Sequence, residues 1–433
     1  MKKLKFIDLF AGLGGFHSAL SGLGLECVFA SEIDEDLRKL YQTNHGIKCQ
    51  GDITKIDIPD IPTHDIICAG FPCQPFSKAG KQNGLKDVDN GNLFDRIMEV
   101  VDYHNPEYIF LENVPNLKGH DGGKTWKYIY DKLSVNYDVK EKTLSPHKFG
   151  IPQHRSRLYI VCRLKSNGGL THFEFPEGDN KELLSIKSII EEKPVEYTLL
   201  KETTKHHIKI WQEFLDNLES KEVPRFPIWA MEFGANYPFE NEAPFEQSAD
   251  ELKKYKGKFG NKIDGHSFDE VLECLPIYSQ IDQEEFPHWK KNYIRANRCF
   301  YTKHKTWLDK WLPKITDFEN SHQKFEWNCG NKTPLKMNDK ILQFRPSGIR
   351  VKKPNFSPAL VIVTTQIPIF PWLDRYMTHR EAAKLQGMDK LKELPKTTAK
   401  VFKALGNAVN VCVVSKIAIK LIKEEIKTKS SFQ

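Results

Sequence analysis

Cysteine pairs with the spacing C-x-x-C are absent from this 433-residue sequence, although it contains nine cysteines. This absence argues against a disulfide framework and a thiolate metal site, so we expect no metal and a reducing compartment. Runs of about 18 unbroken apolar residues, the length of a transmembrane helix, are also absent, so we expect no membrane partner. Neither sign of charge dominates. The 64 Lys and Arg residues against 57 Asp and Glu residues give a net charge of +7, a weak indication of a polyanionic partner.

The pattern of apolar segments divides the chain into parts. Residues 4–10, 64–70 and 108–113 read as short buried strands that alternate with amphipathic helical stretches. This rhythm is typical of a parallel sheet covered on both faces, and it predicts an α/β fold with a doubly wound, mostly parallel sheet. From about residue 165 the rhythm stops, which predicts a second, smaller domain. The predicted domains cover residues 1–170 and 171–395, with a C-terminal segment at 396–433 that returns to the first domain.

A glycine-rich segment, Phe10-Ala-Gly-Leu-Gly-Gly15, lies where the first predicted strand turns into a helix. Glycines at such a turn let the backbone bend sharply and approach a ligand closely. The dinucleotide fingerprint is incomplete because position 17 is not glycine, which favours an adenosine ligand without a diphosphate, such as S-adenosylmethionine. Glu32 is placed to bind a ribose hydroxyl, and Asp52 to accept a hydrogen bond from adenine. The alternative is a tight structural turn with incidental acidic residues.

Three further groups of reactive side chains follow or precede predicted strands. Cys73 lies just past a strand end, where ligands bind in α/β sheets, and positive charge nearby would lower the pKa of its thiol. Glu112 closes another strand, where a raised pKa would let it donate a proton. Gln153, Arg155 and Arg157 alternate before the last predicted strand and would share one face. The alternatives are a small buried cysteine, a surface acid and a solvated strand start.

Together these segments resemble the C5-cytosine-specific DNA methyltransferase family of bacterial restriction-modification systems. The motifs that carry the resemblance follow the family's order: Asp8-Leu-Phe-Ala-Gly-Leu-Gly-Gly15, Gly51-Asp-Ile53, Gly70-Phe-Pro-Cys-Gln74, Glu112-Asn-Val114, Gln153-x-Arg-x-Arg157, Arg380-Glu-Ala-Ala-Lys-Leu-Gln386 and Gly406-Asn-Ala-Val409. One departure is that the family commonly continues after Gln386 with Gly-Phe/Tyr-Pro, whereas this chain has Gly387-Met388-Asp389. The local structure at this turn is therefore left open.

The resemblance implies a Rossmann-like catalytic domain that binds S-adenosyl-L-methionine at 1–170 and a target-recognition domain at 171–395. It implies transfer of a methyl group to C5 of a flipped-out cytosine in double-stranded DNA. The residues implied to bind the cofactor are Phe10, Gly12, Gly14, Glu32, Ile33, Asp52, Ile53, Gly70, Leu93 and Asn407. The implied catalytic residues are Cys73 as nucleophile, Glu112 at cytosine N3, and Arg157 at the base, with Gln153 and Arg155 in support.

The variable region carries the candidate DNA contacts. Residues 286–314 contain eight Lys or Arg residues and one acid, Asp309. Trp289, Tyr293 and Phe300 recur near helical spacing, which predicts the core face of a helix whose other faces would meet phosphates. The alternative for these charges is a solvated face. The residues expected to bind DNA are Gln74, Ser77, Asn297, Arg298, Arg345 and Arg350, because arginine pairs with guanine and asparagine with adenine.

Other functions remain open from the sequence. An RNA methyltransferase of the same family is the nearest alternative, but the long basic variable region favours DNA. A non-catalytic DNA-binding protein is disfavoured by the intact candidate catalytic residues, and a thiol oxidoreductase by the lack of a resolving cysteine. The expected partners are double-stranded DNA and a restriction endonuclease of the same specificity. We expect a monomer in the bacterial cytoplasm, associated with the nucleoid.

Overall fold

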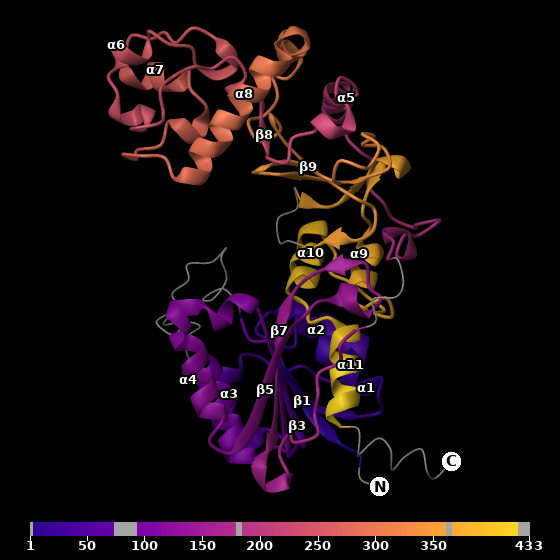
Figure 1. Cartoon of the computed structure of the whole chain (residues 1–433). Coiled ribbons are helices and arrows are strands. Elements are labelled where there is room, and N and C mark those ends of the chain that lie inside the picture. Colours follow the sequence, from indigo (N-terminus) through magenta and orange to yellow (C-terminus); the bar gives the residue numbers. More distant parts are fainter. Residues whose placement is uncertain (1–2, 73–92, 179–183, 361–365, 423–433) are drawn as a thin grey trace. The chain divides into compact units, whose positions relative to one another are not determined.

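A computed structural model describes residues 3–72, 93–178, 184–360 and 366–422 of the chain. The chain forms two compact units (Figure 1). Unit 1 comprises Met1–Pro194, Asn355–Thr364 and Thr378–Gln433, and unit 2 comprises Val195–Pro354 and Thr365–Met377. The borders expected near residues 170 and 396 differ from these, because unit 1 extends to Pro194 and begins again at Thr378.

Unit 1 is built on a six-stranded sheet with the order β2-β1-β3-β4-β7-β5. The first four strands are parallel to their neighbours, as predicted, whereas β7 runs antiparallel to both β4 and β5. The predicted fold class is thus confirmed as a mixed α/β sheet. The strands are β1 Lys5–Leu9, β2 Glu26–Ser31, β3 Ile66–Ala69, β4 Tyr108–Asn113, β5 Tyr137–Leu144 and β7 Arg157–Leu164. A short pair, β6 Gln153–His154 and β12 Ser357–Pro358, lies apart from this sheet.

Helices cover both faces of this sheet (Figure 1). The side chains of strands β3, β4 and β7 alternate between two hydrophobic clusters, as a strand buried on both faces requires. In β4, for example, Ile109 packs with helices α3 and α4, whereas Phe110 packs with α1 and α11. The helices of unit 1 are α1 Gly15–Ser21, α2 Glu35–His45, α3 Leu93–His104, α4 Lys124–Leu133, α9 His379–Leu385, α10 Thr398–Asn407 and α11 Val411–Leu421.

The C-terminal helices belong to this core. Thr398–Leu421 is long and apolar enough to resemble a membrane span, but 61% of its most apolar 18-residue stretch is buried inside the protein. The stretch is broken between α10 and α11, and α11 packs against α1. The turn that departs from the family pattern is also ordered. Gly387 adopts a positive φ of 70°, and the backbone N–H of Met388 donates to the carbonyl of Ala383, so the helix ends without the usual proline.

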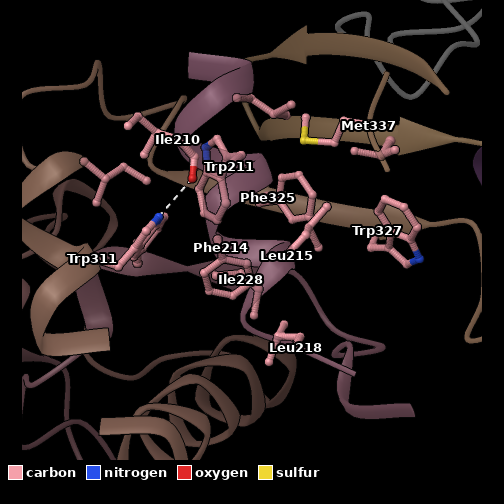
Figure 2. Close-up of a cluster of buried hydrophobic side chains, with 14 of the residues drawn as sticks. Ile210, Trp211, Phe214, Leu215, Leu218, Ile228, Trp311, Phe325, Trp327 and Met337 are labelled. Carbon is pink, nitrogen blue, oxygen red and sulfur yellow. Dashed lines mark hydrogen bonds between the residues drawn. The ribbon is translucent and has the colours of Figure 1, made fainter. Parts of the chain in front are cut away.

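Unit 2 contains a second mixed sheet with the order β14-β13-β10-β11-β9-β8. Its hydrophobic core joins this sheet to helix α5 and the end of α8, with Trp211 stacked on Phe325 at 4.7 Å between ring centroids. The indole N–H of Trp311 donates to the carbonyl of Ile210 at 2.9 Å (Figure 2). The strands are β8 Ile228–Trp229, β9 Lys324–Asn328, β10 Ile341–Arg345, β11 Gly348–Lys352, β13 Ile369–Phe370 and β14 Arg375–Tyr376. The helices are α5 Glu202–Asp216, α6 Ala249–Leu252, α7 Phe268–Glu273 and α8 His288–Trp311.

Candidate active site

The glycine-rich turn between β1 and α1 forms an open cradle. Phe10 adopts a φ of 54°, a left-handed conformation that is strained for a residue with a side chain and is typical of functional turns. Gly12 also has a positive φ of 54°, and a Cβ atom added to it would meet nothing within 4 Å. The space above Gly12 is therefore open to a ligand that approaches the backbone closely.

Glu32 is fixed beside this turn at the end of β2. Its Oε2 accepts a hydrogen bond from the backbone N–H of Gly12 at 2.9 Å, and its Oε1 accepts one from the N–H of Asp34 at 3.0 Å. A carboxylate has about four lone-pair sites, so acceptor capacity remains for a ribose hydroxyl. Ile33 follows with 72% of its surface exposed, which suits packing against a flat ring. These features fit the adenosine part of S-adenosyl-L-methionine.

The segment with Asp52 lies next to Glu32. The backbone N–H of Glu32 donates to the carbonyl of Gln50, and Ser31 and Gln50 form an isolated parallel bridge. Asp52 caps the short helical turn that follows, because its Oδ1 accepts from the N–H of Thr54 at 3.0 Å. This contact uses part of the carboxylate for local structure.

The other predicted cofactor residues have different surroundings. Ile53 is buried in the core, and its carbonyl accepts from Nε of Arg96 at 3.0 Å, which joins this turn to α3. Leu93 begins α3 and is half-buried. Asn407 ends α10 and is exposed. Their roles in cofactor binding stay predictions.

Gly14 has a packing role that Gly12 lacks. A Cβ atom on Gly14 would lie 2.2 Å from Nε2 of His45, so only glycine fits there. The same ring nitrogen lies 3.0 Å from the carbonyl oxygen of Leu13, to which it donates, and the ring stacks on His17 with centroids 4.2 Å apart. Burial lowers the pKa of His45, which keeps the ring neutral beneath the turn. His45 therefore supports the turn from below, a role that its position in the sequence did not reveal.

Glu112 and Arg157 form the second part of the site. They lie on adjacent strands β4 and β7, and Nε of Arg157 is 3.2 Å from Oε1 of Glu112. Glu112 is buried, with 8% of its side chain exposed. Burial raises the pKa of Glu112, and the charges of Arg157 and Arg155 oppose this shift only in part. A carboxyl group in this state is suited to donate or share a proton.

Arg155 and Gly70 lie close to this pair. Nη2 of Arg155 donates to the carbonyl of Ala408 at 3.1 Å, which ties the arginine to the loop before α11. A Cβ on Gly70 would lie 3.0 Å from Val409 and 3.9 Å from Oε2 of Glu112, so Gly70 borders both. The carboxyl ends of β3 and β4 thus meet at this point. Three predicted residues, Cys73, Gln74 and Ser77, lie outside the described residues.

Gln386 is a partner that the sequence analysis did not assign to the site. Its Nε2 donates to Oε1 of Gln153 at 3.1 Å, and both side chains are fully buried. Arg38 is a second one, because its Nη1 donates to the carbonyls of Glu32 and Ile33 and so fixes the loop that exposes Ile33. Gln386 belongs to a motif already recognised, whereas no spacing rule pointed to Arg38.

Two of the predicted DNA-binding residues are instead part of the interior of unit 2. Asn297 is fully buried in α8: its Oδ1 accepts from the N–H of Trp229, and its Nδ2 donates to the carbonyls of Pro227 and Tyr293. Both amide hydrogens and one lone pair of the oxygen serve the fold, and the side chain is shielded from solvent, which argues against base reading. Arg298 donates from Nε to the buried Glu232 at 2.9 Å and is likewise committed to an internal ion pair.

Many charges of the basic region around α8, which was expected to meet phosphates, are paired with acids within the unit. Lys290 and Lys291 are buried, and Arg295 makes a forked ion pair with Glu240. The aromatic prediction holds for Phe300, which is buried, but is wrong for Trp289, which is 54% exposed. Further ion pairs at the surface of this unit join Lys303 to Glu222, Lys305 to Asp309 and Lys314 to Glu213. Arg345 and Arg350 both contact Glu326, and their role toward DNA stays a prediction.

Solved structures of low sequence identity share this fold, an α/β sheet unit with an additional unit. A DNA modification methyltransferase encoded in an E. coli prophage aligns over 97% of this chain and 99% of that chain, with a TM-score of 0.54 and 16% identity. The methyltransferase EhMeth of Entamoeba histolytica aligns over 98% of this chain and 99% of that one, with a TM-score of 0.50 and 18% identity.

The sequence decides the family within this class. The model of the C-5 cytosine-specific DNA methylase family matches residues 4–423, and the chain belongs to this family. The resemblance predicted from the motifs is therefore confirmed.

Curated relatives are type II methyltransferases. M.AluI of Cellulosimicrobium cellulans is 29% identical over 96% of this chain and 91% of its own length. M.MspI of a Moraxella species is 46% identical and M.HhaI of Haemophilus parahaemolyticus is 43% identical, each over 40% of this chain. These two matches span 41% and 53% of the lengths of those relatives.

Proposed function

We propose that the protein is a DNA (cytosine-5)-methyltransferase that uses S-adenosyl-L-methionine and acts on cytosine within a short, specific sequence of double-stranded DNA. The observation that carries this proposal is the contact of Arg157, which is partly exposed, with the buried Glu112 at the carboxyl end of β4. The pair lies beside Gly70, three residues before the candidate nucleophile Cys73. A proton donor and a guanidinium fork at this sheet edge, together with a thiol three residues after Gly70 in the sequence, meet the needs of this reaction.

The chemistry explains why these groups are needed together. C5 of cytosine is too electron-poor to attack a methyl group directly. The Cys73 thiolate adds to C6 and breaks the C5–C6 double bond, while Glu112 gives or shares a proton at N3, so that C5 becomes nucleophilic. The guanidinium of Arg157 holds the Glu112 carboxyl group and offers its remaining donors to the base. Once C5 has bonded to the methyl group, with the electron pair of the broken S–CH3 bond left on the cofactor's sulfur, loss of the C5 proton would expel the Cys73 thiolate and restore the C5–C6 double bond.

The cofactor site supplies the electrophile. When bound, S-adenosyl-L-methionine provides an activated methyl group on a sulfonium. Gly12 leaves open space beside the backbone, Glu32 would accept a hydrogen bond from the ribose, and the exposed Ile33 would pack on the adenine. Because a base within the helical stack is out of reach, the cytosine must be flipped out, which costs a few kcal/mol of unstacking.

The wider role follows from the family. We propose that the methylation protects DNA in a restriction-modification system, with a restriction endonuclease of the same specificity as partner. The protein would act as a monomer in the bacterial cytoplasm, in association with nucleoid DNA.

The test is bisulfite sequencing of genomic DNA from a host that lacks cytosine methylation and expresses this chain. Cys73→Ala is compared with Cys299→Ala, a matched variant of an exposed cysteine in α8. Protected cytosines in one short context, present with the wild type and Cys299→Ala and absent with Cys73→Ala, are expected. Soluble wild-type protein that protects no cytosine would refute the proposal, and methyl transfer onto tRNA would then be measured.

A further inference from the structure

Three neighbouring strands of unit 2 place a polar row on the second face of its sheet. Phe325, Phe344 and Ile349 point into the hydrophobic core, so the alternate residues lie on the opposite face. Strand register aligns Arg350 of β11 with Gln343 of β10 on one side and with Glu326 of β9 on the other. The row therefore consists of an amide, a guanidinium and a carboxylate.

A single carboxylate oxygen of Glu326 holds two arginines. Nε of Arg350 donates to Oε2 at 2.8 Å, and Nη2 of Arg345 lies 3.0 Å from the same atom. Although burial raises the pKa of Glu326, the hydrogen bond from Arg350 and the charges of both arginines lower it overall, so the carboxylate stays ionised. Gln343 is fixed as well, because its Nε2 donates to the carbonyl of Gln366 at 2.9 Å.

The two arginines differ in how many guanidinium donors remain accessible to a ligand. Nε and Nη2 of Arg345 are shielded from solvent, and 14% of its side chain is exposed. Arg350 is bound through Nε, and 31% of its side chain is exposed. Within the described part of the chain, no hydrogen bond or ion pair occupies Nη1 or Nη2 of Arg350. Arg350 thus presents Nη1 and Nη2 as two donors, and the hydrogen bond from its Nε to Glu326 orients them before a ligand binds.

The charges around Arg350 favour a polyanion. Lys324 and Lys352 occupy the same face, so four cations accompany one carboxylate there. Burial lowers the pKa of Lys352, and the charges of Arg350 and Arg345 lower it further. Phosphates that approach this face would relieve this crowding.

We propose that Arg350 is a specificity-determining residue that reads the major-groove edge of a guanine in the DNA target, with Glu326 and Arg345 as positioning residues. The two terminal nitrogens of Arg350 would donate to O6 and N7 of the guanine, a pattern unique to that base in the major groove. Because the Nε bond already restricts the side chain, less conformational freedom is lost when the base is bound. This inference rests on the proposed DNA methyltransferase function.

The test compares the sequence contexts methylated by the wild type and by Arg350→Lys, measured by bisulfite sequencing in the host described above. Lysine keeps the positive charge and a phosphate contact but loses the fork. We expect methylation to persist. At one position that requires a G·C pair, other than the methylated one, the preference for G·C over other base pairs should fall at least about tenfold. Glu326→Gln should relax the same position to a smaller extent, because the fork is no longer held by a charge.

A matched pair of controls comes from α8. Arg295 also makes an ion pair with a glutamate, Glu240, and is 57% exposed. Arg295→Lys and Glu240→Gln change the same groups elsewhere in unit 2 and should leave the methylated context unchanged. If these variants relaxed the same position, the effect would be general destabilisation and the proposal would fail.

Binding to synthetic duplexes gives a second measurement that does not depend on activity. In the identified context, 7-deazaguanine replaces the required guanine and removes the N7 acceptor. The wild type should bind the guanine duplex at least about fivefold more tightly than the substituted one, and Arg350→Lys should reduce this ratio toward one. An unchanged ratio, or a context with no required G·C pair besides the methylated one, would overturn the inference. A wild type that methylates no cytosine would instead refute the proposed function itself.

Discussion

Nε of Arg157 lies 3.2 Å from Oε1 of Glu112, across the antiparallel pair of β7 and β4. The contact joins two residues that are distant in the sequence and that separately resemble ordinary surface charges. Within the described residues, Oε1 accepts no hydrogen bond with good geometry, although it is buried. The carboxyl group is therefore held by charge and remains available for a proton-sharing bond with a substrate.

Replacement of Glu112 by glutamine should slow methyl transfer without loss of cofactor binding. The amide keeps the shape of the carboxyl group but cannot supply a proton, which contributes about 10²–10⁴-fold in general acid catalysis. We expect the single-turnover rate to fall at least about 10²-fold, while the dissociation constant of S-adenosyl-L-methionine stays within about twofold. A single-turnover rate equal to that of the wild type would contradict the role of Glu112.

The same substitution should change how stability depends on pH. Burial raises the pKa of Glu112 in the folded protein above its unfolded value of about 4.3. Its contribution to stability is then complete below the unfolded pKa and is lost as the pH rises through the folded pKa. We would measure the thermal unfolding of Glu112→Gln and of the wild type from pH 4 to pH 8. The unfolding temperature of the variant, relative to that of the wild type, should increase as the pH rises. Parallel curves would show that the pKa is not raised.

The two glycines of the turn should respond differently to alanine. Gly12→Ala should lower stability by about 1–2 kcal/mol, the usual cost of a left-handed alanine, because its Cβ meets no neighbour. The Cβ would occupy the ligand space, so we expect at least about tenfold weaker cofactor binding. Gly14→Ala should destabilise the protein by about 2–5 kcal/mol, because overpacking against His45 adds to the strain.

Thermal unfolding and cofactor titration distinguish these cases. The double variant Gly14→Ala/His45→Ala should recover part of the stability lost by Gly14→Ala, since the ring that clashes is gone. Equal losses of stability for Gly12→Ala and Gly14→Ala would contradict this difference in roles.

Asn297→Ala should destabilise unit 2 without a change in the methylated context. The substitution removes three buried hydrogen bonds, for which we expect a loss of about 2–4 kcal/mol in the free energy of unfolding. Denaturant unfolding measures the loss, and Asn292→Ala, an exposed position in the same helix, is the control. A relaxed methylation context with unchanged stability would restore Asn297 as a base-reading residue.

The candidate catalytic region was largely predictable because its signals are local. Strand ends, glycine turns and acidic residues at fixed spacing identify ligand sites in parallel α/β sheets, so Gly12, Glu32 and Glu112 could be named from the sequence. Glu32 does contact the Gly12 turn. The variable region offered no such rule. Its basic residues were expected to meet phosphates, with a solvated face as the alternative, but several pair with acids from residues 213–240, far away in the sequence.

The sequence by itself determined the family, the α/β class and the candidate residues of the catalytic region, because these depend on motifs of a few residues in a fixed order. Only the tertiary structure decided that β7 is antiparallel, that Arg157 meets Glu112, that Asn297 is internal and that Glu326 holds Arg345 and Arg350. These relationships arise from strand register and from helix packing between distant segments. Local spacing carries no information about such contacts, since the chain between the partners fixes neither their distance nor their orientation.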